Sequence, residues 1–200
     1  MYPLLETIRY EAKAYRNLTL HETRMRRSRS TLFGIDDPVD LDLLLAHLPT
    51  NAGEGRYKCR ILYGESVGPI ELTSYTARRI GSLRVVAADG IDYALKYSDR
   101  GDLEAAGRLR GDCDEVVLSI GGLLTDTTYS NIALYDGSNW ITPEPPLLPG
   151  TKREELIGAG ILDPLPVRVE DLKYYRLISL VNAMLDLGEV TVPVDCVQMI

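Results

Sequence analysis

Apolar and polar positions alternate at the start of the chain in a way that predicts strands and then a helix. Residues 4–11, LLETIRYE, alternate as a half-buried strand does, and residues 13–17, KAYRN, are expected to return beside it. A helix is expected within residues 17–34, with Thr19 as its N-cap and Gly34 at its end.

The next part of the chain contains β-rich runs separated by glycine turns. A short helix within residues 36–49 precedes them and ends at its proline. Three short runs in succession, with turn residues between them, are typical of a meander. These runs are residues 56–65, 68–76 and 82–90.

The pattern changes near residues 86–92, which we take as the boundary between two lobes. Residues 1–88 are expected to form a small α+β lobe and residues 89–200 a larger one. Helices are expected within residues 98–111, 149–160 and 169–175, and strands within 114–122, in a hairpin at 131–143 around Asp136 and Gly137, and around a turn in 176–194.

The composition is that of a globular chain with an excess of acidic residues. Of its 200 residues 45% are hydrophobic and 26% charged, which is ordinary for a protein with a packed core. The formal charge of -7 argues against nucleic acid or an anionic membrane as partner, since both are bound by basic surface. Small-molecule chemistry is therefore the expected class of function.

Cysteine and histidine positions exclude several further kinds of site. Cys59, Cys113 and Cys196 are odd in number and widely spaced, which fits a reducing cytoplasm better than a disulfide framework. His21 and His47 belong to no metal-binding motif, so no metal is expected. No run is apolar and long enough for a signal peptide or a membrane span.

Several positions could carry chemistry, although each has an ordinary structural interpretation. Most of a basic cluster that includes Arg24 should be a solvated helix face. The helix start at Gly150 offers backbone N–H groups to an anion. Asp126 follows a strand among hydroxyl residues, where a turn or capping role is the local interpretation, and most lysines like Lys96 are solvent-exposed.

Six segments in order give these positions a common meaning, because together they resemble the class IV aminotransferases, pyridoxal-phosphate enzymes of fold type IV. The resemblance spans Leu5 to about Val194. It implies a two-lobed α+β or α/β fold like that of D-amino acid aminotransferase, with a shortened N-terminal lobe and the cofactor between the lobes. The segments are LETIRYE, LTLHETRMRRS, LKYSDR, GLLTDTTYSNI, TPEPPLLPGTKREEL and LVNAML.

The resemblance assigns the cofactor-binding roles. Lys96 matches the lysine that forms the Schiff base and shuttles the Cα proton. Arg24 and the backbone N–H groups of Thr151 and Lys152 match the phosphate site. Asp126 stands where the family has a glutamate facing the pyridine nitrogen, and it is one methylene shorter.

The resemblance also implies roles for the remaining site residues. The resemblance gives Asn131 the role of orienting the segment that carries Asp126. It makes the turn at Asn182, Ala183 and Met184 a source of backbone donors to a substrate carboxylate.

The reaction is expected to be that of a 4-amino-4-deoxychorismate lyase, because Arg100 stands four residues after Lys96 as in the K-H-L-N-R segment of those enzymes. They release pyruvate and yield 4-aminobenzoate, a folate precursor. The alternatives are a branched-chain or D-amino-acid aminotransferase and, less favoured, a non-catalytic binding protein on the same scaffold. A homodimer is implied, which could replace substrate groups that a short N-terminus lacks.

Overall fold

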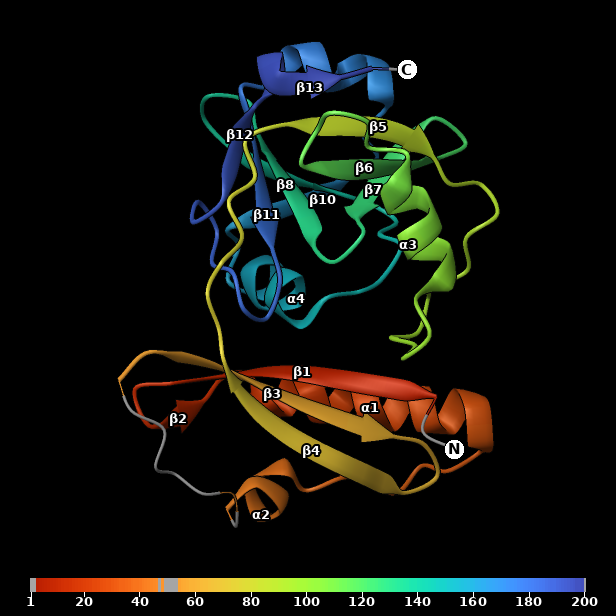
Figure 1. Ribbon diagram of the computed structural model, residues 1–200, viewed down its shortest axis with the longest axis vertical. Helices are drawn as coiled ribbons and strands as arrows, with labels where there is room; N and C mark the ends of the chain where they lie inside the picture. The colour runs from red at the N-terminus through yellow and green to blue at the C-terminus, as the bar shows by residue number, and fades with distance from the viewer. Residues whose placement is uncertain (1–2, 47, 49–53, 200) are drawn as a thin grey trace. The chain divides into compact units, whose positions relative to one another are not determined.

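A computed structural model describes residues 3–46, 48 and 54–199 (Figure 1). The chain divides into two compact units, and neither is a single stretch of sequence. The predicted lobes, residues 1–88 and 89–200, would meet at a single boundary in the sequence. In the structure, Leu95–Asp99 returns to the first unit after part of the second. The first unit is Met1–Thr76 with Leu95–Asp99, and the second is Ala77–Ala94 with Arg100–Ile200.

The first unit contains a four-stranded antiparallel sheet in the order β2-β1-β3-β4. The strand predicted in residues 4–11 is confirmed as β1, which pairs along its whole length with β3, but the predicted half-buried alternation is wrong, because both faces of the strand are largely buried. The predicted return of residues 13–17 is also confirmed as the short strand β2. The strands are β1 (Leu4–Glu11), β2 (Ala14–Tyr15), β3 (Arg56–Tyr63) and β4 (Val67–Ser74).

Helix α1 (Leu18–Phe33) lies along one face of this sheet (Figure 1). Its predicted end is confirmed, since Gly34 adopts φ 68° and donates its backbone N–H to the last carbonyls of the helix. Thr19 as the N-cap is wrong. Asn17, with φ 57°, begins the helix, and Thr19 lies inside it. The short helix α2 (Leu41–Leu45) begins at Asp40, whose side chain accepts from Leu43 N at 2.8 Å.

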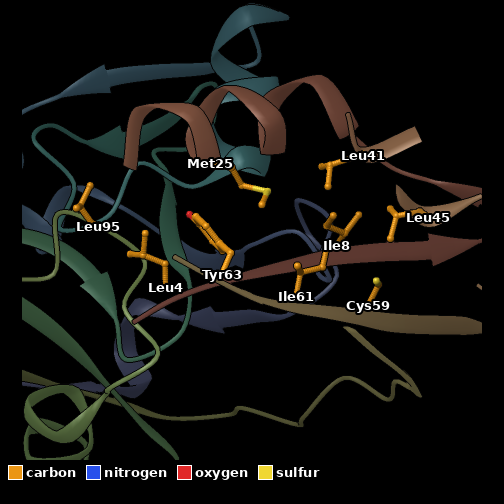
Figure 2. Packing of buried hydrophobic residues seen from close by; sticks show 9 residues of the cluster. All are labelled: Leu4, Ile8, Met25, Leu41, Leu45, Cys59, Ile61, Tyr63 and Leu95. Carbon is orange, nitrogen blue, oxygen red and sulfur yellow. The ribbon is translucent and has the colours of Figure 1, made fainter. Parts of the chain in front are cut away.

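The core of the first unit lies between α1 and the sheet. Figure 2 shows Met25 of α1 above apolar side chains of β1 and β3. Leu95 is buried in the same cluster, although it comes more than thirty residues after β3. Burial of Leu95 holds the following residue, Lys96, in this unit. The cluster comprises Leu4, Ile8, Met25, Leu41, Leu45, Cys59, Ile61, Tyr63 and Leu95.

The second unit contains a nine-stranded mixed sheet. Its longest path runs in the order β10-β9-β8-β7-β6-β5-β13, while β11 pairs with β8 and β12. The strands are β5 (Leu83–Ala87), β6 (Glu115–Ile120), β7 (Leu123–Thr127), β8 (Asn131–Tyr135), β9 (Trp140–Pro143), β10 (Leu162–Leu165), β11 (Leu177–Val181), β12 (Thr191–Pro193) and β13 (Val197–Gln198). The helices are α3 (Gly101–Arg108), α4 (Thr151–Gly158) and the 3-10 turns η1 (Val169–Tyr174) and η2 (Val194–Cys196).

Strand pairing in the second unit corrects two predictions. The meander is wrong, because β5 pairs in parallel with β6 of the second unit and belongs to a different sheet from β3 and β4. Asp126 does not follow a strand but lies within β7, which the sequence pattern missed. The hairpin of β8 and β9 is confirmed. Among the described residues, no helix is both long and apolar enough to span a membrane.

Candidate active site

Lys96 is fixed beside the beginning of β1 by backbone hydrogen bonds. Leu5 donates its N–H to the carbonyl oxygen of Lys96 at 3.0 Å, and Tyr97 forms an isolated bridge with Leu4. One residue further on, Ser98 N donates to Pro3 O at 2.7 Å. The Lys96 side chain is half-buried. The segment therefore extends the sheet edge next to the strand that carries Glu6.

Glu6 is fully buried and binds two side chains of α1. Arg24 donates from Nε to Glu6 Oε1 at 2.8 Å and from Nη2 to Oε2 at 2.6 Å. His21 places Nδ1 at 2.7 Å from Oε2 of the same carboxylate. These two residues are three apart on the helix, so both face the sheet. The result is a buried cluster of one anion and two basic side chains.

Burial and the neighbouring charges set the protonation of this cluster. Burial alone would raise the pKa of Glu6, but the charge of Arg24 and the hydrogen bonds from His21 and Arg24 lower it to about 2. The pKa of His21 is lowered, mainly by burial and further by the charges of Arg24 and Lys96. His21 is therefore a neutral donor to Glu6 at neutral pH, and Lys96 acts on it electrostatically.

In the second unit, Asp126 and Asn131 are directly opposite each other where β7 meets β8. Asn131 Nδ2 donates to Asp126 Oδ1 at 2.9 Å, and Leu148 N donates to Oδ2 at 2.9 Å. Burial raises the pKa of Asp126 to about 7, because these amide donors and the charge of Arg153 offset the desolvation only in part. A nearby cation would restore the ionised form.

Asn131 also fixes the start of α4. Its Nδ2 donates to Leu148 O at 2.8 Å, and a Cβ on Gly150 would lie 2.0 Å from its Oδ1. Glycine is therefore required before Thr151, the first residue of the helix. The first turn of a helix presents backbone N–H groups that lack intrahelical acceptors. The carboxyl of Asp126 is thus tied through Asn131 to the start of α4.

Lys152 is the second residue of α4, and its side chain forms ion pairs with two carboxylates. Its Nζ pairs with Glu155 Oε2 at 3.0 Å and Asp186 Oδ1 at 2.8 Å. The expected role of Lys152 concerned its backbone N–H, which its position in the first turn allows.

The expected substrate residues are held by contacts within the second unit. Arg100 donates from Nη2 to Thr128 O at 2.8 Å, and Asn182 Nδ2 donates to Tyr129 O at 3.2 Å. The same two-residue stretch thus receives both side chains. It lies in the turn of residues 128–130 that joins β7 to β8, and Thr127 separates it from Asp126.

The turn at Asn182, Ala183 and Met184 uses most of its own donors. Met184 N donates to Asn182 Oδ1 at 2.8 Å, and Asn182 N donates to Leu185 O at 3.3 Å. Three backbone N–H groups of this turn were expected to bind a substrate carboxylate. Those of Asn182 and Met184 are used in these two hydrogen bonds, and that of Ala183 is not.

Comparison with known proteins identifies the family to which this arrangement belongs. A family model described as amino-transferase class IV matches residues 3–191. The chain therefore belongs to the class IV aminotransferases, which are pyridoxal-phosphate-dependent enzymes of fold type IV. The resemblance seen in the sequence is confirmed, and with it the fold class.

Two Haemophilus proteins match nearly the whole chain. An uncharacterized protein from Haemophilus influenzae is 34% identical over 185 residues, which are 92% of this chain and 98% of the relative. A crystal structure from Haemophilus somnus, provisionally named a 4-amino-4-deoxychorismate lyase, is 32% identical with a TM-score of 0.88 and covers 94% of this chain and 98% of that one.

A more distant structure shares the fold. The pyridoxal-phosphate-bound form of a hypothetical aminotransferase from Mycobacterium tuberculosis is 19% identical, has a TM-score of 0.75, and covers 94% of this chain and 80% of that one.

The chemistry of the two groups of residues fits this cofactor. In the first unit, buried Arg24 offers a guanidinium that suits a phosphate, and Lys96 offers an amine that suits an aldehyde. In the second, Asn131 and Leu148 donate to the buried Asp126 from neutral amides, so its charge would be balanced by a protonated pyridine nitrogen. Sequence reasoning missed Glu6 and His21, although both lie in the segments that carried the resemblance.

Proposed function

We propose that this enzyme is a 4-amino-4-deoxychorismate lyase, which converts its substrate to 4-aminobenzoate and pyruvate. The observation that carries the proposal is the likeness, at 32% identity over 94% of the chain, to the Haemophilus somnus structure that bears this name. Arg100, four residues after Lys96, supports it. The folate precursor 4-aminobenzoate would place the enzyme in folate biosynthesis.

The proposed roles follow from the position of each side chain. Bound pyridoxal phosphate supplies an electron-accepting ring to which the substrate amine is joined. Lys96 would bind the cofactor covalently in the resting enzyme, and its freed amine would carry the proton removed from the substrate carbon that bears the amino group. Asp126 retains a negative charge against the ring nitrogen, and Asn131 keeps that carboxyl oriented through the 2.9 Å bond to Oδ1.

Binding residues complete the proposal. Arg24 and the backbone N–H groups of Thr151 and Lys152 would hold the cofactor phosphate. Arg100 and the Ala183 N–H would meet substrate carboxylates, of which 4-amino-4-deoxychorismate has two. Arg100 Nη2 donates to Thr128 O at 2.8 Å, which ties this guanidinium to the turn that follows β7.

The first prediction tests the reaction directly. Purified protein loaded with pyridoxal phosphate should release pyruvate and 4-aminobenzoate from 4-amino-4-deoxychorismate without any 2-oxo acid, because elimination needs no amino acceptor. Pyruvate is measured with a coupled dehydrogenase and 4-aminobenzoate by fluorescence. Product formation that depends on an added 2-oxo acid would instead assign the chain as an aminotransferase acting on branched-chain or D-amino acids.

The cofactor state provides the control for that assay. The loaded protein should be yellow, and borohydride should abolish both the visible band and the activity, because it reduces the bond to Lys96. A Lys96→Ala variant should lose the borohydride-sensitive band. A colourless wild-type protein that ignores added pyridoxal phosphate would favour the binding-protein alternative.

The assembly and compartment belong to the same proposal. We propose a homodimer, as the resemblance to fold type IV enzymes implies, and a cytoplasmic location, which the widely spaced cysteines support. Sedimentation equilibrium should give twice the chain mass of 22.2 kDa. A mass of one chain at micromolar concentration would refute the dimer.

A further inference from the structure

Glu6 holds two basic side chains in the buried part of the first unit, yet no role in cofactor binding follows from its position in the motif. Its side chain is 0% exposed and accepts hydrogen bonds from Arg24 and His21. A buried carboxylate is costly to desolvate unless it is bound on both oxygens. Its two oxygens are therefore used to hold basic side chains.

The contact with Arg24 is bidentate, and this decides what Glu6 can do. A guanidinium is a planar fork, so two parallel bonds to one carboxylate fix its plane as well as its position. Here the bonds run from Nε and Nη2, at 2.8 and 2.6 Å. Without them, an arginine retains several rotatable bonds and loses entropy when it binds a phosphate.

His21 adds a second restraint to the same carboxylate. Its Nδ1 lies 2.7 Å from Oε2, the oxygen that also receives Arg24 Nη2. Because His21 is neutral at neutral pH, it donates a hydrogen bond without adding a cation beside Arg24 and Lys96. The single turn between His21 and Arg24 on α1 makes both contacts possible.

We propose that Glu6 is a positioning residue for the cofactor phosphate, holding the Arg24 guanidinium in a fixed plane with His21 as the second support. The inference rests on the proposed phosphate-binding role of Arg24 and goes beyond it, because Glu6 would act through Arg24 and not through a contact of its own with the cofactor. A purely structural buried ion pair would stabilise the fold without discriminating between ligands. Positioning by Glu6 instead predicts an effect that depends on the phosphate.

The test compares two ligands that differ only in that group. Apo protein is titrated with pyridoxal phosphate and with pyridoxal, and binding is followed by the visible band of the lysine-bound ligand. Glu6→Gln keeps the side-chain volume but replaces one acceptor oxygen with a donor that faces the N–H groups of Arg24 or His21. We expect it to weaken pyridoxal phosphate binding by about tenfold or more and pyridoxal binding by less than about twofold.

Glu11→Gln is the matched control on the same strand. Glu11 also pairs with arginines, accepting from Arg9 Nε at 3.0 Å and lying 3.5 Å from Arg56 Nε, but it is at the other end of β1. This variant should leave the affinities of both ligands unchanged. An equal loss of affinity for both ligands in Glu6→Gln, or no loss for either, would overturn the positioning role.

Arg24→Ala separates this inference from the role on which it rests. If Glu6 acts through Arg24, Glu6→Gln should cause little further loss of pyridoxal phosphate affinity in an Arg24→Ala background. An additive loss contradicts the positioning role, and an unchanged affinity in Arg24→Ala alone contradicts the phosphate role of Arg24. Should Glu6→Gln not fold, Glu6→Asp keeps the charge and moves both oxygens back; an unchanged ratio of the two affinities in that variant also overturns the proposal.

Discussion

Asp126 shows how a single buried side chain can be set up for a charged ligand. Its hydrogen bonds from Asn131 and Leu148 come from neutral amides, and burial raises its pKa from 3.8 to about 7. Without the cofactor, ionising this carboxyl in the folded protein is costly. A protonated ring nitrogen would offset that cost, whereas in the apo protein the buried carboxylate destabilises the fold.

This leads to a prediction about the pH dependence of the apo protein. Between about pH 4 and 7 folded Asp126 keeps its proton while the unfolded chain has lost it, so stability should fall as pH rises through this window. Asp126→Asn should remove this contribution, which is roughly 4 kcal/mol at most because one pKa unit is worth about 1.4 kcal/mol. Urea unfolding of both apo proteins at pH 4 and pH 8 measures it; parallel pH profiles would contradict the expectation.

The same variant should separate binding from chemistry. Because Asn131 and Leu148 remain in place, Asp126→Asn should leave pyridoxal phosphate binding largely intact while turnover slows sharply, since the ring nitrogen loses its negative partner. Single-turnover rates with saturating substrate report the change. An unchanged rate would show that this carboxyl is not the partner of the ring nitrogen.

At the scale of an element, helix α4 begins where it does because a side chain from β8 occupies the space around Gly150. The backbone of Gly150, with φ -80° and ψ 142°, is accessible to any residue. The requirement for glycine therefore comes from Asn131 Oδ1, 2.0 Å from the position of a Cβ. Steric contact and not backbone conformation fixes this residue.

A pair of alanine substitutions in one helix tests that conclusion. Gly150→Ala should displace Asn131 and destabilise the fold by about 1–3 kcal/mol, the range for overpacking, and it should weaken cofactor binding. Gly158→Ala, at the other end of α4 with nothing within 4 Å of its Cβ, should be neutral or stabilising by up to about 1 kcal/mol. Thermal unfolding with and without pyridoxal phosphate distinguishes them, and equal effects would refute the steric explanation.

Helix α1 explains why the charged cluster was only partly visible in the sequence. Its buried residues recur at helical spacing, yet they are mostly polar, so a search for an apolar face passes over them. The expectation that most of the basic cluster Arg24, Arg26, Arg27 and Arg29 would be solvated is wrong, because only Arg26 and Arg27 of these four are exposed. Arg26 is exposed and pairs with Asp36, whereas buried Arg29 donates to backbone carbonyls, including Glu65 O at 2.7 Å.

For the whole molecule, the proposed cofactor residues are divided between the two units. Lys96 and Arg24 belong to the first, and Asp126 and Thr151 to the second. Binding of a ligand to residues of a unit stabilises that unit against opening, by an amount set by the ligand concentration relative to Kd. The cysteines report on each unit separately, since Cys59 is buried in the first and Cys113 in the second.

Bound cofactor should therefore slow thiol labelling of the buried cysteine in each unit. Burial raises the pKa of Cys59 to about 12, so it should react only when its unit opens. Pyridoxal phosphate at about 100 times Kd should slow labelling of both Cys59 and Cys113 by about 100-fold, read by mass spectrometry. Exposed Cys196 serves as the internal control. Protection of one buried cysteine alone would show that the cofactor binds residues of a single unit.

The sequence by itself determined the local elements and the chemistry of the positions. Alternation defined β1, glycine set the end of α1, and the ordered segments gave the family with Lys96, Arg24 and Asp126. These features depend on neighbours within a few residues, or on residue types in a fixed order. Local sequence is sufficient for such features because backbone preference and side-chain periodicity are short-range properties.

Only the tertiary structure decided which partners these residues have. Pairing of β5 with β6, the return of Leu95–Asp99 to the first unit and the carboxylate that holds Arg24 all join residues far apart in the chain. Burial gave Asp126 its raised pKa, because desolvation depends on everything that surrounds a group and not on its neighbours in sequence. Long-range packing sets the protonation and orientation of side chains whose identity the sequence had already supplied.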